Sequence, residues 1–299
     1  MQKIFRILLY LSLVFFIWHL YRADYLIFRD ISFDAAKLSA SMLILFAGFL
    51  VTCLSWYRAL RLSGKRVNFS DAVISHGRFI FSKYIPGKFW VILGRASHLS
   101  SQKKSLRFLS LVSLQEQLLF VWWGLVLSLP PTFFVTEKPW IALIILTAIV
   151  LLAFLILSGW FHRNSSGLLN RIFKKDFDFR PMKISFFLRV SAPVILFWLL
   201  WSAGFWFLMI SMYDDIPPLL ALAFPAGITY GFVVIFLPAG IGVREGIVAS
   251  FLIAGGISSA NAVTISVISR FWFVAGEIFI FMLSWVMQLT GKGAGPPRQ

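Results

Sequence analysis

The sequence has few of the residues from which soluble proteins build their surfaces and stabilise their folds. Only 13% of the 299 residues are charged, and only 12 residues are acidic, whereas a soluble domain carries about 25% charged residues. A single cysteine, Cys53, excludes an intrachain disulfide. A soluble enzyme, a disordered chain and a disulfide-stabilised secreted domain are therefore all poor fits.

The sequence also lacks the familiar motifs of catalysis and metal binding. The four histidines are scattered, no His-Glu-x-x-His pair is present, and no second cysteine could complete a zinc site. Neither a Walker phosphate loop nor a Gly-x-Ser-x-Gly nucleophile turn occurs. We therefore expect no catalytic residue, no metal and no cofactor, and energy from ATP would have to come from another protein.

Apolar residues dominate instead, at 59% of the chain, with 33 Phe, 12 Trp and a mean hydropathy of +0.84. A bilayer crossing takes about 20 apolar residues, and open sheet edges cannot be satisfied in lipid. The sequence therefore predicts an all-α, polytopic membrane helix bundle, forming a single integral membrane domain over 1–299. The six clear spans lie at 5–21, 38–60, 108–130, 139–160, 185–212 and 261–289. The first could also be a secretory signal, but it has no small-residue cleavage site, which favours an uncleaved first helix.

Basic residues outnumber acidic ones by 28 to 12, a net charge of +16, and their distribution predicts the orientation. One set of connections, which includes a loop at 161–184, holds 16 basic residues against Asp176 and Asp178. The positive-inside rule places this set, and both termini, in the cytoplasm. The other connections hold 4 basic and 6 acidic residues and belong outside. In a membrane protein this balance points to anionic lipid headgroups, not to nucleic acid.

Two further apolar stretches, 70–100 and 219–256, are interrupted near their centres by Pro, Gly and charged residues. With the orientation above, each must begin and end on one side, as a re-entrant helical hairpin or a pair of short crossings. The order helix, hairpin, helix then occurs twice, within a first half at 38–160 and a second half at 185–289. Opposite orientations of two such halves are typical of an inverted-topology repeat, whose broken helices form a substrate site near the midplane. Chance similarity between two Pro-Gly turns is the alternative.

Eight basic and four acidic residues fall within the apolar segments, where a central charge costs about 2.5–3.5 kcal/mol. Arg58, Asp71 and Arg189 lie near segment ends and are expected to reach the interface. The remaining set is Arg78, Lys83, Lys88, Arg95, Arg244 and Arg270 with Glu116, Glu245 and Glu277. Pairing within this set leaves a positive excess that an anionic ligand would neutralise. For any single charge, a purely structural ion pair carries about equal weight.

Both interrupted stretches combine a helix-breaking turn with basic residues. A broken helix exposes backbone N–H groups that attract anions, and Arg can hold a phosphate through two parallel hydrogen bonds. The sequence therefore predicts a phosphate-sized site. The residues expected to bind substrate are Lys88, Arg95, Glu116, Arg244, Glu245, Arg270 and Glu277. The residues expected to shape the hairpins are Pro86, Gly87, Pro238, Gly240 and Gly242.

Several of these residues form patterns that resemble the flippase-like transmembrane family. That family includes the membrane domains of lysylphosphatidylglycerol synthase and of the multiple peptide resistance factor. The patterns are Tyr84-Ile85-Pro86-Gly87 leading to Gly94-Arg95-Ala96, the pair Gln115-Glu116, the stretch from Leu237 to Gly246, and Arg270. The most specific is Pro-x-Gly-x-Gly-Val-Arg-Glu, and the resemblance covers about 5–289. It implies movement across the bilayer of an aminoacylated phospholipid or of a polyprenyl-phosphate-linked sugar.

Two departures from the family pattern bear on the substrate. The first hairpin reads Gly-Lys-Phe-Trp where many members carry additional glycines, so its turn is expected to be bulkier and its substrate to differ. The acyltransferase-like domain that makes lysyl lipid is absent from this sequence, so we expect the chain not to synthesise such a lipid.

The leading hypothesis is a translocator, or flippase, of the bacterial inner membrane. Its substrate would be an anionic or aminoacylated phospholipid or a polyprenyl-phosphate-linked sugar, and its protein partners would be enzymes of envelope or glycan biosynthesis. One alternative is a membrane glycosyltransferase that uses a lipid-linked sugar donor, with Asp24, Asp30 or Asp34 as base or metal ligand. A second is a non-catalytic scaffold of envelope biosynthesis.

Overall fold

The computed structural model describes residues 32–64, 67–84, 90–100, 106–136, 138–159, 181–233 and 242–290, and every regular element in these ranges is helical. Five helices are long and apolar enough to cross a membrane. They are α2 (Ala35–Leu62), α5 (Leu106–Val135), α6 (Pro139–Leu157), α8 (Ile184–Ile210) and α11 (Ser259–Leu289). The all-α class and five of the six predicted spans are therefore confirmed. The predicted span at 5–21, and most of the predicted loop at 161–184, lie outside the described residues.

Short helices occupy both interrupted stretches. The first holds α3 (Phe69–Arg78), η1 (Ile80–Tyr84) and α4 (Trp90–Leu99), and the second holds η2 (Pro218–Leu222), α9 (Ala223–Val233) and α10 (Val243–Ala254). At 1.5 Å per residue the four short α-helices are each about 15–18 Å long, roughly half the hydrocarbon thickness of a bilayer. None of these four helices is long enough to cross alone.

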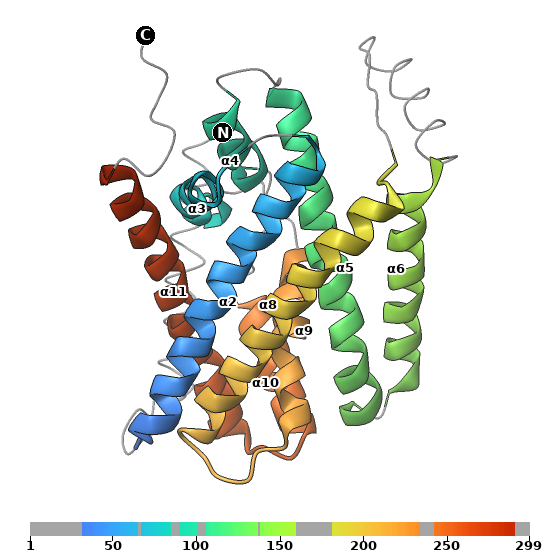
Figure 1. The fold of residues 1–299 in the computed structure, drawn as a ribbon. Helices are drawn as coiled ribbons and strands as arrows, with labels where there is room; N and C mark the ends of the chain where they lie inside the picture. The colour runs from blue at the N-terminus through green and yellow to red at the C-terminus, as the bar shows by residue number, and fades with distance from the viewer. Residues whose placement is uncertain are drawn as a thin grey trace, which may run out of the picture.

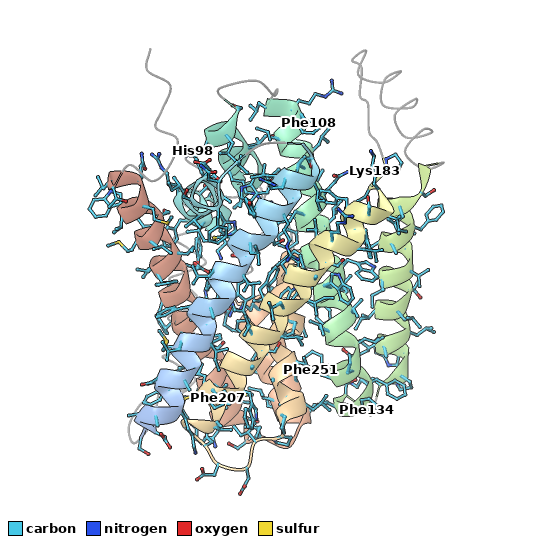
Figure 2. All side chains as sticks on the ribbon, in the orientation of Figure 1. His98, Phe108, Phe134, Lys183, Phe207 and Phe251 are labelled. Carbon is cyan, nitrogen blue, oxygen red and sulfur yellow. The ribbon has the colours of Figure 1, made fainter. Side chains whose placement is uncertain are left out.

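The two sets of short helices lie toward opposite ends of the bundle (Figure 1). α3 and α4 lie near the end where α2 finishes and α5 begins, whereas α10 lies toward the end where α8 finishes and α11 begins. His98 and Lys183 mark the first end, and Phe134 and Phe207 mark the second (Figure 2).

The long helices differ in how much apolar surface they bury. α2 and α8 form the most extensive helix contact in the described chain, and Trp56 and Trp198 are fully buried beside it. α6 packs on α5 but leaves Leu143, Ile144 and Val150 each more than half exposed. A continuous apolar surface of this kind is expected where a helix faces lipid.

Close approach of α9 to α10 depends on glycine. The Gly-x-x-x-Gly spacing of Gly227 and Gly231 predicts tight helix packing. A Cβ on Gly227 would lie 2.5 Å from Val248 Cγ2, and a Cβ on Gly231 would lie 3.4 Å from the Cβ of Arg244. Gly242 and Gly246 have the same Gly-x-x-x-Gly spacing, but a Cβ on Gly246 would meet no described atom within 4 Å. The first pair therefore holds α9 directly against the start of α10.

Candidate functional site

A cavity of about 150 Å³ lies where the two sets of short helices meet. Nine elements contribute to its lining, namely α2, α3, η1, α4, α5, α8, α9, α10 and α11. The charged residues of the lining are Lys83, Glu116, Arg244, Arg270 and Glu277. The aromatic residues of the lining are Phe49, Tyr84, Phe120, Phe197, Trp201, Phe232 and Phe273. Charged groups are therefore gathered on an otherwise apolar and aromatic wall.

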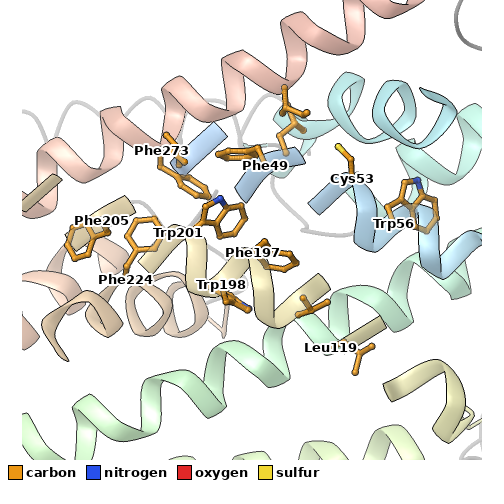
Figure 3. Close-up of a cluster of buried hydrophobic side chains, with 14 of the residues drawn as sticks. Phe49, Cys53, Trp56, Leu119, Phe197, Trp198, Trp201, Phe205, Phe224 and Phe273 are labelled. Carbon is orange, nitrogen blue, oxygen red and sulfur yellow. The ribbon is translucent and has the colours of Figure 1, made fainter. Parts of the chain in front are cut away.

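The aromatic part of the wall is a packed cluster (Figure 3). Ring centroids are 5.1 Å apart between Phe49 and Trp201, 5.0 Å between Phe49 and Phe273, and 4.9 Å between Trp201 and Phe273. Phe197 adds a further ring 5.0 Å from Trp201. Interlocked rings of this kind exclude water and lower the local dielectric, which strengthens every electrostatic interaction in the cavity.

The carboxylate of Glu116 on α5 is fully engaged by its neighbours. Its Oε2 lies 2.5 Å from Arg95 Nη2, and its Oε1 accepts a hydrogen bond of 2.9 Å from Ser55 Oγ. Glu116 is only 4% exposed. The pairing leaves neither of its oxygens available for another cation.

The carboxylate of Glu277 on α11 is engaged in the same way. Lys83 Nζ donates to Oε1 at 2.6 Å, and the Tyr84 hydroxyl donates to Oε2 at 2.8 Å. Both donors come from η1, so this pair connects the first interrupted stretch to the last helix. Glu277 is buried, and the contact fixes η1 at the edge of the cavity.

Glu245 on α10 has a structural role at the start of its helix. Gly242 has a φ of 84°, a conformation that side chains with a Cβ rarely adopt. Glu245 Oε2 accepts a hydrogen bond of 2.7 Å from the Gly242 N–H, and Oε1 lies 3.6 Å from Arg270 Nη1. These contacts end the turn and position Arg244 in the first turn of α10. Glu245 is not part of the cavity lining.

Arg95 is completely buried, and its partners hold it away from the cavity. Nε donates to Ser113 Oγ at 2.6 Å, and Nη2 donates to the Ser113 carbonyl at 2.8 Å. Its guanidinium lies 4.3 Å from the ring centroid of Trp56, and Glu116 neutralises its charge. Arg95 is not part of the cavity lining, and its charge is compensated by Glu116, which is part of it. Direct contact of Arg95 with a substrate stays a prediction.

Arg244 lines the cavity and is in the opposite situation. Its side chain is buried, at 4% exposed, yet Nε and Nη2 have no hydrogen-bond partner in the described part of the chain. The guanidinium lies 4.8 Å from the ring centroids of both Phe224 and Phe273. Cation–π contact offsets part of the cost of burial, but the two N–H groups stay available to an anion.

The charges around the cavity balance to a single positive excess. Glu116, Glu277 and Glu245 each face one cation, respectively Arg95, Lys83 and Arg270. Arg244 has no carboxylate within ion-pair distance among the residues described. The excess expected from the sequence is larger because it also counts Arg78, which is exposed, and Lys88, which lies outside the described residues.

Several predicted residues cannot be compared with the structure. Lys88, Pro86, Gly87, Pro238 and Gly240 lie outside the described residues. Conversely, Lys83 and Tyr84 belong to the cavity although the sequence-based substrate set omitted them. Their position directly before the Ile-Pro-Gly turn was the signal that could have identified them.

The metal and catalytic candidates of the sequence can be compared with the structure in part. The described residues contain no group of three or more His, Cys, Asp or Glu side chains that could hold a metal ion. Asp34, one of the three candidate bases, instead accepts hydrogen bonds from the backbone N–H groups of Ala36 and Lys37 at the start of α2. Asp24 and Asp30 lie outside the described residues.

The spanning-length helices and the apolar outer surface of α6 define a multi-pass membrane protein. Over residues 3–275 the sequence matches the family described as the lysylphosphatidylglycerol synthase TM region. The chain belongs to this family, as the motifs around Arg95 and Arg244 predicted, and the family relates it to the handling of lipids or glycolipids. No curated protein matches the chain.

Proposed function

We propose that this protein is a translocator of the bacterial inner membrane that moves a phosphate-bearing lipid between leaflets. The substrate classes are an anionic phospholipid, an aminoacylated phospholipid and a polyprenyl-phosphate-linked sugar. The observation that carries the proposal is the buried guanidinium of Arg244, which has no ion-pair partner among the described residues and lines a central cavity in a lipid-related membrane family. An uncompensated buried charge is costly, and a phosphate held by Arg244 would remove that cost.

The pattern of helix contacts supports an inverted-topology repeat. Exchanging α2 with α8, α3 with α9, α4 with α10 and α5 with α11 converts observed contacts into one another. The contact of α3 with α11 becomes that of α9 with α5, and the contact of α4 with α5 becomes that of α10 with α11. The α2–α8 contact converts into itself. In our proposal the two interrupted stretches are re-entrant hairpins related by this pseudo-symmetry, with the substrate site between them.

The distribution of charge supports an orientation with both termini in the cytoplasm. Arg61 and Lys183 lie at the end of the bundle where α2 finishes and α8 begins (Figure 2). Asp34 and Asp214 lie at the other end, beside Lys37. Because basic connections stay on the cytoplasmic side, the first end would face the cytoplasm and α10 would lie in the outer half of the bundle.

The proposed cycle needs no ATP. The headgroup would enter the cavity and replace water at Arg244, while the acyl or prenyl tail stays in the lipid. The charge pairs that connect η1 to α11 and α10 to α11 would then rearrange to open the other side. Moving one net charge across the membrane involves about 2.3 kcal/mol per 100 mV. The direction of transport would follow the membrane potential or consumption of the lipid.

Proteoliposomes that contain the purified full-length chain test the proposal. Fluorescent phospholipids and polyprenyl-phosphate sugars are placed in one leaflet, and their appearance in the other is followed with an impermeant quencher. We expect the wild type to accelerate exchange of at least one class, and Arg244→Gln to reduce the acceleration at least about tenfold. Arg189→Gln, which changes an exposed arginine, is the matched control. Normal exchange by a folded Arg244→Gln protein would contradict the proposal.

A further inference from the structure

We infer that the headgroup bound in this cavity is a compact phosphate monoester with net negative charge, and not the ammonium-bearing headgroup of an aminoacylated lipid. This inference rests on the proposed function and selects the anionic class among its three candidates. It follows from which charged groups in the cavity still have unused hydrogen-bonding capacity.

The carboxylates of the cavity are already paired with protein cations. Glu277 accepts from Lys83 and Tyr84, and Glu116 faces Ser55 and Arg95. An ammonium brought to either carboxylate would have to share that acid with Lys83 or Arg95. Two cations on one buried carboxylate leave a positive charge uncompensated, which is strongly unfavourable.

The cationic groups, by contrast, can accept a phosphate without breaking any pair. Arg244 Nε and Nη2 have no partner in the part of the chain that the structure describes, and Arg244 belongs to the lining. Together the two nitrogens form the two-donor edge that binds two oxygens of one phosphate. Lys83 also lines the cavity, and an ammonium has three N–H donors, so it can bond a further oxygen while it remains paired with Glu277. A phosphate monoester carries a charge of about −1.5 to −2 at neutral pH, which these two cations can share.

The size of the cavity also favours a small headgroup. Its volume is about 150 Å³, below the roughly 300–1,000 Å³ of pockets that enclose drug-sized ligands. A terminal phosphate adds no further group beyond its oxygens, whereas a lysyl-glycerol or a sugar does. The packed rings of Phe49, Trp201 and Phe273 form one wall and limit expansion on that side.

Lipid binding to the full-length protein in detergent micelles tests the inference. Four probes are compared by native mass spectrometry and by thermal shift: phosphatidic acid, phosphatidylglycerol and lysyl-phosphatidylglycerol with identical acyl chains, and inorganic phosphate. We expect phosphatidic acid to bind at least about tenfold more tightly than either of the other lipids. We expect Arg244→Gln to weaken phosphatidic acid binding about ten- to hundredfold, and Arg189→Gln to leave it unchanged.

Three results would overturn the inference. They are equal or tighter binding of the lysyl lipid, unchanged phosphatidic acid binding by a folded Arg244→Gln protein, and inorganic phosphate as tight as phosphatidic acid. The wild-type comparison needs no variant, so poor folding of Arg244→Gln does not remove the test. Transport of lysyl lipid that depends on Arg244 would refute the inference and keep the proposed function. Tight phosphatidic acid binding without transport of any lipid would do the reverse.

Discussion

Arg95 and Arg244 are both buried arginines on short α-helices but differ in what surrounds them. Each lies on the second short helix of its interrupted stretch, is at least 96% buried, and stacks on aromatic rings. Nε and Nη2 of Arg95 bind Ser113, and Glu116 pairs with its charge, which leaves only Nη1 without a partner among the described residues. Arg244 has neither a carboxylate partner nor a hydrogen bond to Nε or Nη2 in the same part of the chain. Burial of an arginine in a membrane domain is therefore not enough to indicate a ligand site. A buried arginine indicates a ligand site only where protein groups do not already compensate its charge.

The difference arises from how the neighbouring carboxylates are used. On α5, Glu116 pairs with Arg95, and no second cation lies within ion-pair distance of its Oε2 among the described residues. On α11, Glu277 is taken by Lys83 and Tyr84, and Glu245 is taken by the Gly242 N–H and Arg270. Glu277 and Glu245 therefore hold η1 and the start of α10 in place. Arg244 faces the cavity without a carboxylate partner among the described residues.

The largest effect on stability is expected at the compensated arginine. Glu116→Leu removes the partner of a fully buried guanidinium, so we expect the free energy of unfolding to fall by about 3–5 kcal/mol. The double change Arg95→Met with Glu116→Leu removes both charges and is expected to recover most of that loss. Denaturant unfolding of the two variants in detergent, followed by circular dichroism, measures the difference. Equal destabilisation by the single and double changes would show that charge compensation is not what Glu116 provides.

The next largest effect on stability is expected where α9 packs against the start of α10, the helix that carries Arg244. In Gly227→Ala the new Cβ would lie 2.5 Å from Val248 Cγ2 and 3.1 Å from the Arg244 carbonyl oxygen, so we expect a loss of about 1–3 kcal/mol from overpacking. Gly246→Ala is the matched control on α10, because its Cβ meets no described atom within 4 Å and alanine favours the helix. Thermal unfolding of both variants tests this. A Gly227→Ala protein as stable as Gly246→Ala would show that α9 and α10 are not tightly packed.

A smaller effect is expected where η1 joins α11. Tyr84→Phe removes the hydroxyl that donates to Glu277 Oε2 at 2.8 Å, at a cost of about 1–3 kcal/mol because the acceptor is a charged, buried group. Lys83 still holds the other oxygen, so the helix contact is expected to persist. Tyr57→Phe, on a tyrosine whose ring meets that of Phe69 edge to face, provides a comparison at another site. The rate of amide hydrogen exchange in η1 should rise in Tyr84→Phe and stay unchanged in Tyr57→Phe. The opposite pattern would show that the contact with Glu277 does not hold η1 in place.

The smallest effect is expected at the exposed start of α2. The backbone N–H of Lys37 and then that of Ala36 donate to the Asp34 carboxylate, and these bonds with the nearby Lys37 charge lower the pKa of Asp34 below its usual value of 3.8. A lowered pKa in the folded state gives stability that is present above the unfolded value and lost as the pH falls through the folded value. Asp34→Asn keeps a helix cap but removes the charge, so its stability should lack this acid dependence. An identical acid profile for both proteins would contradict the assignment.

The sequence predicted the long helices well because a bilayer imposes a simple requirement on length and polarity. Five spans, the two interruptions and the family could be identified from apolar runs, from Pro and Gly, and from the Pro-x-Gly-x-Gly-Val-Arg-Glu motif. The ion pairs between helices could not be predicted in the same way. Lys83 and Glu277 are 194 residues apart in the chain. No local sequence pattern shows that Glu277 pairs with Lys83 or that Arg244 has no carboxylate partner among the described residues.

The most direct test compares Arg95→Gln with Arg244→Gln in two measurements, the free energy of unfolding and lipid exchange in proteoliposomes. We expect Arg95→Gln to lower the free energy of unfolding by several kcal/mol, because Glu116 loses its cation. We expect Arg244→Gln to leave stability nearly unchanged but to reduce lipid exchange at least about tenfold. If Arg244→Gln unfolds the protein as strongly as Arg95→Gln does while the folded fraction transports lipid normally, the central claim that Arg244 is kept free for a substrate is wrong.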